Sequence, residues 1–225
     1  MRTLIVLATL LLFTGVVRGE DGIHALLARL KSTAEDPVAL ERTLKRGEGR
    51  IILCSHCHGH DGNSLRDHVP NLAGQNAEYL LRQFEYFGSG KRKNFVMTRL
   101  AATLDPEDRI AIALWYGSQK VRPRAPSDPS LIEQGRRHFQ AICFSCHGRD
   151  GLGHAALPRL ANQPEQYVIN TLTAYRNGER QRPESPMNGV ATRLKDEEIR
   201  ALAAYITSMN PELAADGGAS RIANR

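Results

Sequence analysis

The motif Cys54-Ser55-His56-Cys57-His58 recurs as Cys143-Phe144-Ser145-Cys146-His147, and the interpretation of the whole chain starts from it. Two thiols three positions apart, followed at once by a histidine, are typical of covalent attachment of a c-type haem. One helical turn presents both sulfurs to the porphyrin vinyl groups, and the next residue places an imidazole beneath the iron. Cys54, Cys57, Cys143 and Cys146 are all the cysteine in the chain. The sequence therefore predicts two covalently bound haem c groups.

Zinc is the main alternative, since two paired cysteine motifs can form a four-thiolate site, and a thioredoxin-like dithiol is a second. Zinc pairs are usually separated by ~15–20 residues. Here the second pair begins 89 residues after the first. Zinc also does not require a histidine directly after each pair, so the pattern favours haem over both alternatives.

The first nineteen residues have the pattern of an export signal. Arg2 supplies a positive start, an apolar run extends from Leu4 to Val17, and Gly19 offers a small residue at a cleavage point. The run is shorter than the ~20 residues of a membrane span, and an uncleaved anchor is the alternative. Export to the periplasm agrees with haem attachment, because thioether bonds protect cysteines from pairing in an oxidising compartment.

The charge of the chain does not indicate a nucleic-acid partner. The formal net charge is +6, and two haems would add four propionates that offset most of it. Residues 20–118 carry 13 basic and 13 acidic residues, whereas residues 119–225 carry 15 and 11. This uneven charge either orients the protein toward redox partners or is a solvated surface without a function.

A repeat covers most of the chain after the signal. The matched positions are 58–62 with 147–151, 70–75 with 158–163, 79–81 with 167–169, and Met97, Leu104 and Trp115 with Met187, Leu194 and Tyr205. The offset stays between 88 and 90 residues. A single unit is therefore present twice, with small changes in loop length.

Helical periodicity and capping residues predict helices in both units, and no segment alternates convincingly as a strand. Helices are expected at residues 77–87 and 165–176, after the caps Asp36 and Asp105, and from Asp196 onward. The expected divisions are a signal peptide (1–19), a helical extension (20–46), a first domain (47–118), an extended linker (119–132), a second domain (133–210) and a flexible tail (211–225). The extension either covers one face of the first domain, which is the expectation, or docks a partner.

Met97 and Met187 are the candidates for the sixth iron ligand. They follow His58 and His147 by 39 and 40 residues, each on the expected loop before the last helix of its unit. Gap-filling in a core is the alternative for any methionine, and it is the expectation for the unmatched Met209. The remaining histidines lack matched partners and are expected to be surface or structural residues: His24, His56, His60, His68, His138 and His154.

The attachment motif, the Pro-x-Leu segments at Pro70 and Pro158, and a methionine before an aromatic-containing last helix together resemble the class I cytochrome c pattern. Two such units in an exported chain resemble the di-haem cytochrome c4 family. The resemblance implies an all-α fold of two tandem class I cytochrome c domains, related by a pseudo-twofold axis with the haem propionate edges close together. It also implies that the carbonyls of Pro70 and Pro158 accept hydrogen bonds from His58 and His147.

The resemblance implies an electron carrier rather than an enzyme. Such a protein carries one electron per haem in the periplasm, between respiratory or dehydrogenase donors and a terminal oxidase or another acceptor, and is soluble or peripherally bound to the membrane. The alternatives are the electron-accepting subunit of a dehydrogenase, such as a sulfide-oxidising flavoprotein, and a di-haem peroxidase. The basic segments 91–93 and 180–182 either dock acidic partners or are solvated loops.

One part of the first unit departs from the family pattern. Gly135 and Phe139 fit the crossing of the first and last helices in the second unit, but the positions in register with them are Arg46 and Arg50. Gly47 and Ile51 would fit only with a shift of one residue. The sequence therefore leaves the helix crossing of the first unit undefined.

Overall fold

The computed structural model describes residues 19–179 and 185–211. The expected export signal before Gly19, the basic segment 180–182 and the expected tail after Pro211 lie outside the described residues. Within the described ranges the fold is helical, with one isolated bridge between His154 and Leu157 and no strand. None of the helices in these ranges is both long and apolar enough to cross a bilayer. The predicted all-α class is confirmed.

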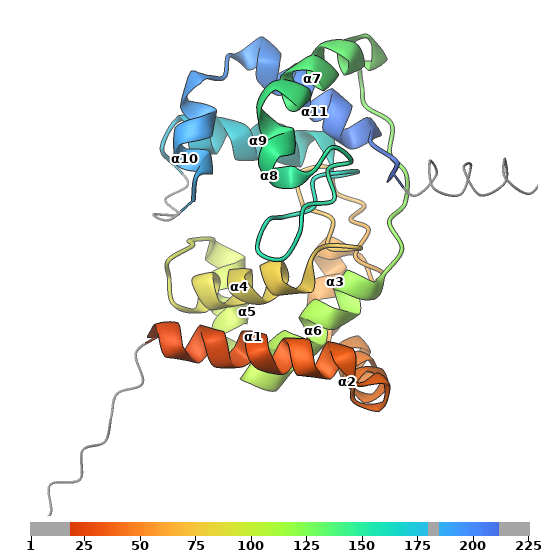
Figure 1. Cartoon of the computed structure of the whole chain (residues 1–225), viewed down its shortest axis with the longest axis vertical. Helices are drawn as coiled ribbons and strands as arrows, with labels where there is room; N and C mark the ends of the chain where they lie inside the picture. Colours follow the sequence, from red (N-terminus) through yellow and green to blue (C-terminus); the bar gives the residue numbers. More distant parts are fainter. Residues whose placement is uncertain (1–18, 180–184, 212–225) are drawn as a thin grey trace, which may run out of the picture.

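Two helical units follow one another along the chain and lie at opposite ends of the molecule's long axis (Figure 1). The first contains α1 (Gly19–Glu35), α2 (Pro37–Arg50), α3 (Ile52–His58), α4 (Ala77–Gly88), α5 (Phe95–Thr103) and α6 (Pro106–Ser118). The second contains η1 (Pro129–Leu131), α7 (Ile132–His138), the π-helix η2 (Phe139–Cys143), α8 (Phe144–His147), α9 (Glu165–Arg176), α10 (Met187–Val190), η3 (Ala191–Arg193) and α11 (Asp196–Ser208).

The expected helix starts are formed by side-chain caps. Asp36 accepts hydrogen bonds from the backbone N–H groups of Val38 and Ala39, and Asp105 accepts one from Asp108. Each cap satisfies donors that the first helical turn leaves without a partner. The helix expected from Asp196 begins at that residue, and the Glu198 carboxylate accepts from the backbone N–H of Lys195.

In both units the helix that leads to the attachment motif crosses the last helix at a glycine: α2 crosses α6 at Gly47, and α7 crosses α11 at Gly135. A Cβ atom on Gly135 would lie 1.9 Å from the Ala201 carbonyl oxygen, and one on Gly47 would lie 2.4 Å from the Ala111 carbonyl oxygen. Only a residue without a side chain allows so close an approach. The structure therefore defines the crossing that the sequence left open: Gly47, rather than Arg46, is the counterpart of Gly135.

The one-residue shift is absorbed just before the haem-attachment motif. Ile51 and Phe139, one turn after the two glycines, are both fully buried. Phe139 precedes Cys143 by four residues, whereas Ile51 precedes Cys54 by three. The extra residue is taken up by the π-helix η2, since a π-helix closes each hydrogen bond over one more residue than an α-helix. In the first unit α2 instead ends at Arg50, and α3 begins at Ile52.

Arg46 and Arg50, which are out of register with the crossing, hold a buried carboxylate. The side chain of Asp108 is 3% exposed. Its two oxygens accept hydrogen bonds from Arg46 Nε at 2.8 Å and from Arg50 Nε at 2.7 Å. Burying a carboxylate is costly unless it is paired, so these arginines tie α2 to the start of α6.

Helix α1 packs against the first unit. It contacts α2, α4 and α6, and Leu26, Leu27 and Leu30 join the core of this unit. Arg29 forms an ion pair with Glu107 on α6. The crossing helix α2 begins at Pro37, and it thus includes residues that the sequence analysis assigned to the extension. The domain limits remain predictions.

Two glutamines join the units reciprocally. Gln75 Oε1 accepts from Arg159 N at 2.7 Å, and its Nε2 donates to Arg159 O at 2.9 Å. Gln163 Oε1 accepts from Asn71 N at 3.1 Å, and its Nε2 donates to Asn71 O at 3.0 Å. Gln75 and Gln163 are matched positions of the repeat, as are Asn71 and Arg159. Such an exchange is that of a twofold, self-complementary interface.

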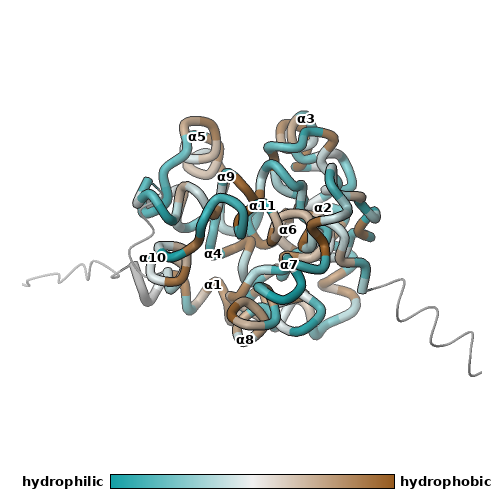
Figure 2. The backbone as a smooth tube through the Cα atoms, turned by 90° about the horizontal axis from the view of Figure 1, so that it is seen from above, coloured by the Kyte–Doolittle hydropathy of each residue, from teal (hydrophilic) through white to brown (hydrophobic). Residues whose placement is uncertain are grey.

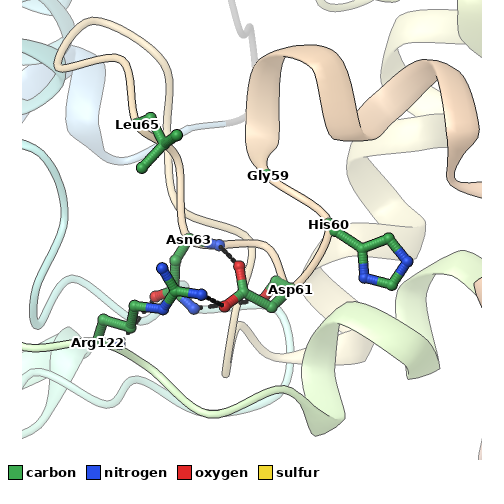
Figure 3. A pocket seen from close by; sticks show the side chains of 6 residues that line it. All are labelled: Gly59, His60, Asp61, Asn63, Leu65 and Arg122. Atoms are coloured by element: carbon green, nitrogen blue, oxygen red, sulfur yellow. Dashed lines mark hydrogen bonds and ion pairs between the residues drawn. The ribbon is translucent and has the colours of Figure 1, made fainter.

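The linker is extended, as expected, and is attached to the first unit. The Asn63 side chain donates to Lys120 O at 2.9 Å and accepts from Arg122 N at 2.8 Å. Arg122 also forms an ion pair with Asp61 (Figure 3). These contacts place the start of the linker against the loop that follows His58.

Candidate haem sites

His58 is the last residue of α3. Its imidazole is buried, and one ring nitrogen, Nδ1, is used in a hydrogen bond. Its Nδ1 lies 2.9 Å from the carbonyl oxygen of Pro70. Burial lowers the pKa of His58, and the hydrogen bond to Pro70 only partly opposes this effect. A neutral imidazole that donates from Nδ1 carries its lone pair on Nε2. This arrangement prepares Nε2 to bind a metal and fixes the orientation of the ring.

His147 at the end of α8 has the same environment. It is 7% exposed, against 8% for His58. Its Nδ1 lies 2.9 Å from the carbonyl oxygen of Pro158. Burial again lowers the pKa of this histidine. The two candidate sites are therefore built alike, and in both the imidazole is neutral and oriented by a proline carbonyl.

The four cysteines do not form disulfides. Burial raises the pKa of Cys54 and raises that of Cys143 to about 11. A thiol with a raised pKa holds little of the thiolate that a nucleophile or a zinc ligand needs. Within residues 19–179 and 185–211, no group of three or more histidine, cysteine, aspartate or glutamate side chains could hold a metal ion. Burial of Cys54 and Cys143 therefore argues against a reactive dithiol, and two cysteines followed at once by a histidine fit thioether-linked haem.

Met97 lies on a helix rather than on the expected loop. The side chain of Asn94 caps α5 by accepting hydrogen bonds from Val96 N at 3.1 Å and Met97 N at 2.9 Å. Sequence analysis missed this cap because α5 lacks a strong periodic pattern. Met187 begins the short helix α10. Both candidate methionines thus lie in the first turn of a helix.

Each candidate methionine packs against the same core as the first cysteine of its unit. Met97 and Cys54 pack against the core of the first unit, and Met187 and Cys143 pack against that of the second. Met209 is itself a buried core residue, as expected. Within each unit, the candidate methionine and the first cysteine thus border one hydrophobic core.

Three of the other histidines have contacts separate from the candidate iron ligands: His56, His60 and His138. His56 Nδ1 lies 2.9 Å from Ile52 O, on the attachment helix itself. The ring of His60 meets that of Trp115 edge to face, with centroids 6.2 Å apart. His138 Nδ1 lies 3.8 Å from Glu198.

Arg92 is half-buried and acts electrostatically on His58, although the sequence shows it only as part of a basic segment. Its guanidinium lies over the Phe87 ring at 4.4 Å and donates to Gln83 Oε1 at 2.7 Å. Its positive charge also contributes to the lowered pKa of His58, after burial. Nothing in the sequence distinguishes Arg92 from Lys91 and Lys93 in this respect.

A shallow pocket of about 260 Å³ lies beside the loop after His58 (Figure 3). It is lined by Gly59, His60, Asp61, Asn63, Leu65 and Arg122. The charged side chains in it, Asp61 and Arg122, are paired with each other. The pocket is therefore a hollow beside the linker attachment and offers no separate site.

Comparison with known proteins finds relatives that match over most of this chain. The Cytochrome c family profile matches residues 132–210. Cytochrome c4 of Pseudomonas aeruginosa is 34% identical over 176 residues, which cover 73% of this chain and 87% of the relative. A thiosulfate dehydrogenase electron acceptor of Stutzerimonas stutzeri is 30% identical over 201 residues, covering 84% and 93% of the two chains.

Solved structures show the same likeness. Reduced recombinant cytochrome c4 from Pseudomonas stutzeri superposes with a TM-score of 0.70 at 33% identity, covering 74% of this chain and 98% of that one. The protein is an electron carrier with two covalently bound haem c groups in two tandem cytochrome c domains, and it is not an enzyme. With its two matched sites and these relatives, the chain belongs to the cytochrome c4 family.

Proposed function

We propose that the first haem is attached through Cys54 and Cys57, with His58 and Met97 as the axial iron ligands. The second haem is attached through Cys143 and Cys146, with His147 and Met187 as its ligands. The observation that supports this assignment best is the hydrogen bond from each histidine Nδ1 to a proline carbonyl, at 2.9 Å in both units. It leaves Nε2 of each imidazole available on the buried side.

The bound haems supply reversible one-electron chemistry at iron. The protein's own groups limit the structural reorganisation that accompanies the gain or loss of an electron. Pro70 and Pro158 hold the imidazoles in one orientation, and Asn94 fixes the helix turn that carries Met97. A site with six ligands and a buried, oriented histidine changes little in geometry when the iron gains or loses an electron. Methionine–histidine ligation also raises the reduction potential, which suits a carrier in a high-potential chain.

The interface lies next to both sites, which supports electron exchange between the haems. Asn71 and Arg159, whose backbones are held by Gln163 and Gln75, directly follow Pro70 and Pro158. The glutamine contacts therefore fix one haem site relative to the other. Electrons arriving at one haem would then equilibrate with the second before leaving.

We place the carrier in the periplasm, because residues 1–19 have the pattern of an export signal. Its donors would be respiratory enzymes or a dehydrogenase, and its acceptor a terminal oxidase or another redox protein. A haem-to-protein ratio of two, followed by a redox titration that resolves two one-electron steps, tests the proposal. A ratio of one, or a protein without haem from cells able to mature c-type cytochromes, would refute it.

A second candidate partner is thiosulfate dehydrogenase. One relative is named as its electron acceptor, and a chain of the solved thiosulfate dehydrogenase TsdBA from Marichromatium purpuratum superposes with a TM-score of 0.65 at 33% identity. The superposition covers 74% of this chain but only 40% of that chain. Reduction of this protein by a thiosulfate dehydrogenase at a rate that saturates with carrier concentration would support the pairing. A mitochondrial cytochrome c serves as the control carrier. Reduction of this protein no faster than reduction of the control would exclude the pairing.

A further inference from the structure

The two units have a twofold arrangement, but the hydrogen bonds between them are not the same in both directions. Viewed along the long axis, the attachment helices α3 and α8 lie at opposite edges of the molecule (Figure 2). In a twofold interface, each contact made by one unit is returned by the other. Gln75 and Gln163 follow this rule. The residues directly after them are Asn76 and Pro164, which differ in chemistry.

Asn76 donates two hydrogen bonds to the second unit. Its Nδ2 lies 2.7 Å from the carbonyl oxygen of Leu157 and 3.2 Å from that of Leu152. An amide NH2 group has two donors, and each has an acceptor here. If the amide were turned the other way, its oxygen would face two carbonyl oxygens, so the contacts determine its orientation. Pro164, the matched residue of the second unit, has a side chain that cannot donate a hydrogen bond.

The two carbonyls that Asn76 binds belong to the loop between α8 and Pro158. One belongs to the residue before Gly153, whose backbone N–H donates to His147 O at 2.8 Å. The other belongs to the residue before Pro158, whose own carbonyl oxygen lies 2.9 Å from His147 Nδ1. Asn76 therefore holds both ends of segment 152–157, and each end lies next to a residue that contacts the histidine.

Consecutive residues of the first unit thus hold both neighbours of Pro158. Asn76 binds the carbonyl of Leu157, which precedes the proline. Gln75 binds the backbone N–H and C=O of Arg159, which follows it. A movement of either neighbour would shift the proline carbonyl that orients the imidazole of the second site.

The first site is held in part by its own unit. Ser64 Oγ donates to Cys57 O at 3.0 Å, and Ser64 N donates to Asn71 Oδ1 at 2.9 Å. At an offset of 89 residues, the counterpart of Ser64 is Gly153, which has no side chain. The loop after α3 thus has an internal support at a position where the loop after α8 has none, and the latter loop takes support from Asn76 instead.

The reverse contact lies farther from its proline. Asp67, in the loop after α3, accepts hydrogen bonds from Gln166 N at 3.1 Å and Tyr167 N at 2.8 Å. These bonds satisfy donors at the start of α9, a helix without a side-chain cap of its own. Asp67 precedes Pro70 by three residues. On the side before each proline, the interface therefore reaches the direct neighbour of Pro158 but not that of Pro70.

We propose that Asn76 is a positioning residue for the second haem: from the first unit it holds the carbonyl of Pro158 against His147, and it thereby sets the reduction potential of that haem. This inference rests on the proposed ligation of the second haem by His147. A hydrogen bond from Nδ1 makes an imidazole a stronger donor to a metal through Nε2. A stronger donor favours ferric iron, so a looser hydrogen bond to Pro158 raises the potential.

The test compares Asn76→Ala with Gln163→Ala in the full di-haem protein. The side chain of Asn76 makes no cap hydrogen bond to α4, so the first variant removes the two bonds to the second unit and leaves the start of this helix intact. Gln163→Ala removes the bonds to Asn71, beside Pro70, and is the control for a general loosening of the interface. A redox titration followed by NMR of the haem methyl groups measures the potential of each haem separately.

We expect Asn76→Ala to raise the potential of the second haem and to leave that of the first unchanged, whereas Gln163→Ala should act mainly on the first. In the reduced protein, the Nδ1 proton of His147 should exchange with water faster in Asn76→Ala, and that of His58 should exchange at the wild-type rate. Faster exchange would show that the hydrogen bond to Pro158 has loosened.

Unchanged potential and exchange at the second site in Asn76→Ala would overturn the proposal. So would equal changes at both haems, or a larger change at the second haem in Gln163→Ala, because either result would indicate a general loosening of the interface. The wild-type protein tests the ligation independently: the ring protons of His147 should be strongly shifted by the haem ring current. Absence of that shift would refute the proposed ligand itself, and a normal shift with an unaffected Asn76→Ala would refute the positioning alone.

Discussion

The side-chain amide of Gln163 in the second unit pairs with both backbone polar groups of Asn71 in the first. Its Nε2 donates to Asn71 O at 3.0 Å, and its Oε1 accepts from Asn71 N at 3.1 Å. Both residues are buried. The contact satisfies two backbone groups that lie beside Pro70, whose carbonyl orients His58. The backbone at Pro70 and Asn71 therefore serves both purposes: Pro70 orients His58, and Asn71 connects the first unit to the second.

Gln163→Ala should destabilise the protein by about 2 kcal/mol or more, because it leaves the N–H and C=O of Asn71 buried without partners. Guanidinium unfolding of the haem-loaded protein measures this change. Gln166→Ala, which removes an exposed glutamine that bonds to Asn170 on the same helix, should change the stability by less than about 0.5 kcal/mol. Equal midpoints for the two variants would mean that the glutamine contacts do not hold the units together.

Met97→Ala and Met187→Ala should each abolish the methionine–iron charge-transfer absorption of one haem and lower its reduction potential, because methionine ligation raises the potential. Optical spectroscopy with a redox titration separates the two haems. Met209→Leu is the control: Met209 is a buried core residue, so both absorption contributions should remain. A full band in the Met97 and Met187 variants would show that the sixth ligands are wrongly assigned.

Gly47→Ala should destabilise the first unit by about 1–3 kcal/mol, the usual cost of overpacking. The added Cβ would lie 2.4 Å from Ala111 O and 2.8 Å from Trp115 Cβ. Gly49→Ala on the same helix meets no atom within 4 Å and should stabilise it by about 0.5–1 kcal/mol through helix propensity. Thermal unfolding of the two haem-loaded variants distinguishes them. Opposite signs are expected, and a neutral Gly47→Ala would contradict the crossing.

The linker contact should depend on pH. Burial raises the pKa of Asp61, but hydrogen bonds from Asn63 and the charge of Arg122 outweigh it, and the pKa lies below its ordinary value. A carboxyl with a lowered pKa in the folded state contributes stability above its unfolded pKa of ~3.9, and this is lost as the pH falls through the folded value. In Arg122→Gln the Asp61 pKa should rise. NMR titration of the carboxyl measures it, and Lys120→Gln, which removes a linker charge not paired with Asp61, should change it far less.

Local signals in the sequence predict much of the fold because they act over a few residues. The caps Asp36 and Asp105 start their helices where expected, and the helix expected at residues 165–176 is α9 itself. The two attachment motifs and the matched methionines identify the cofactor class without any tertiary information. These features depend on spacing within one turn or on repetition, and a single sequence records both.

Features that depend on contacts between distant segments could not be predicted. The repeat pairs Gln75 with Gln163, but spacing alone does not show that each amide reaches across to the other unit. Arg92 looks like its basic neighbours, although its guanidinium lies over the Phe87 ring and its charge acts on His58. The register at Gly47 was ambiguous because the sequence cannot show where an extra residue is accommodated.

The π-helix before Cys143 also bears on how such a duplicated protein can change. A residue gained or lost at this joint alters the turn that grips the porphyrin, while the glycine contact at Gly135 stays in place. Each copy can therefore gain or lose a residue directly before its attachment motif while the helix crossing is kept. Two units that began as duplicates can in this way diverge through a single insertion.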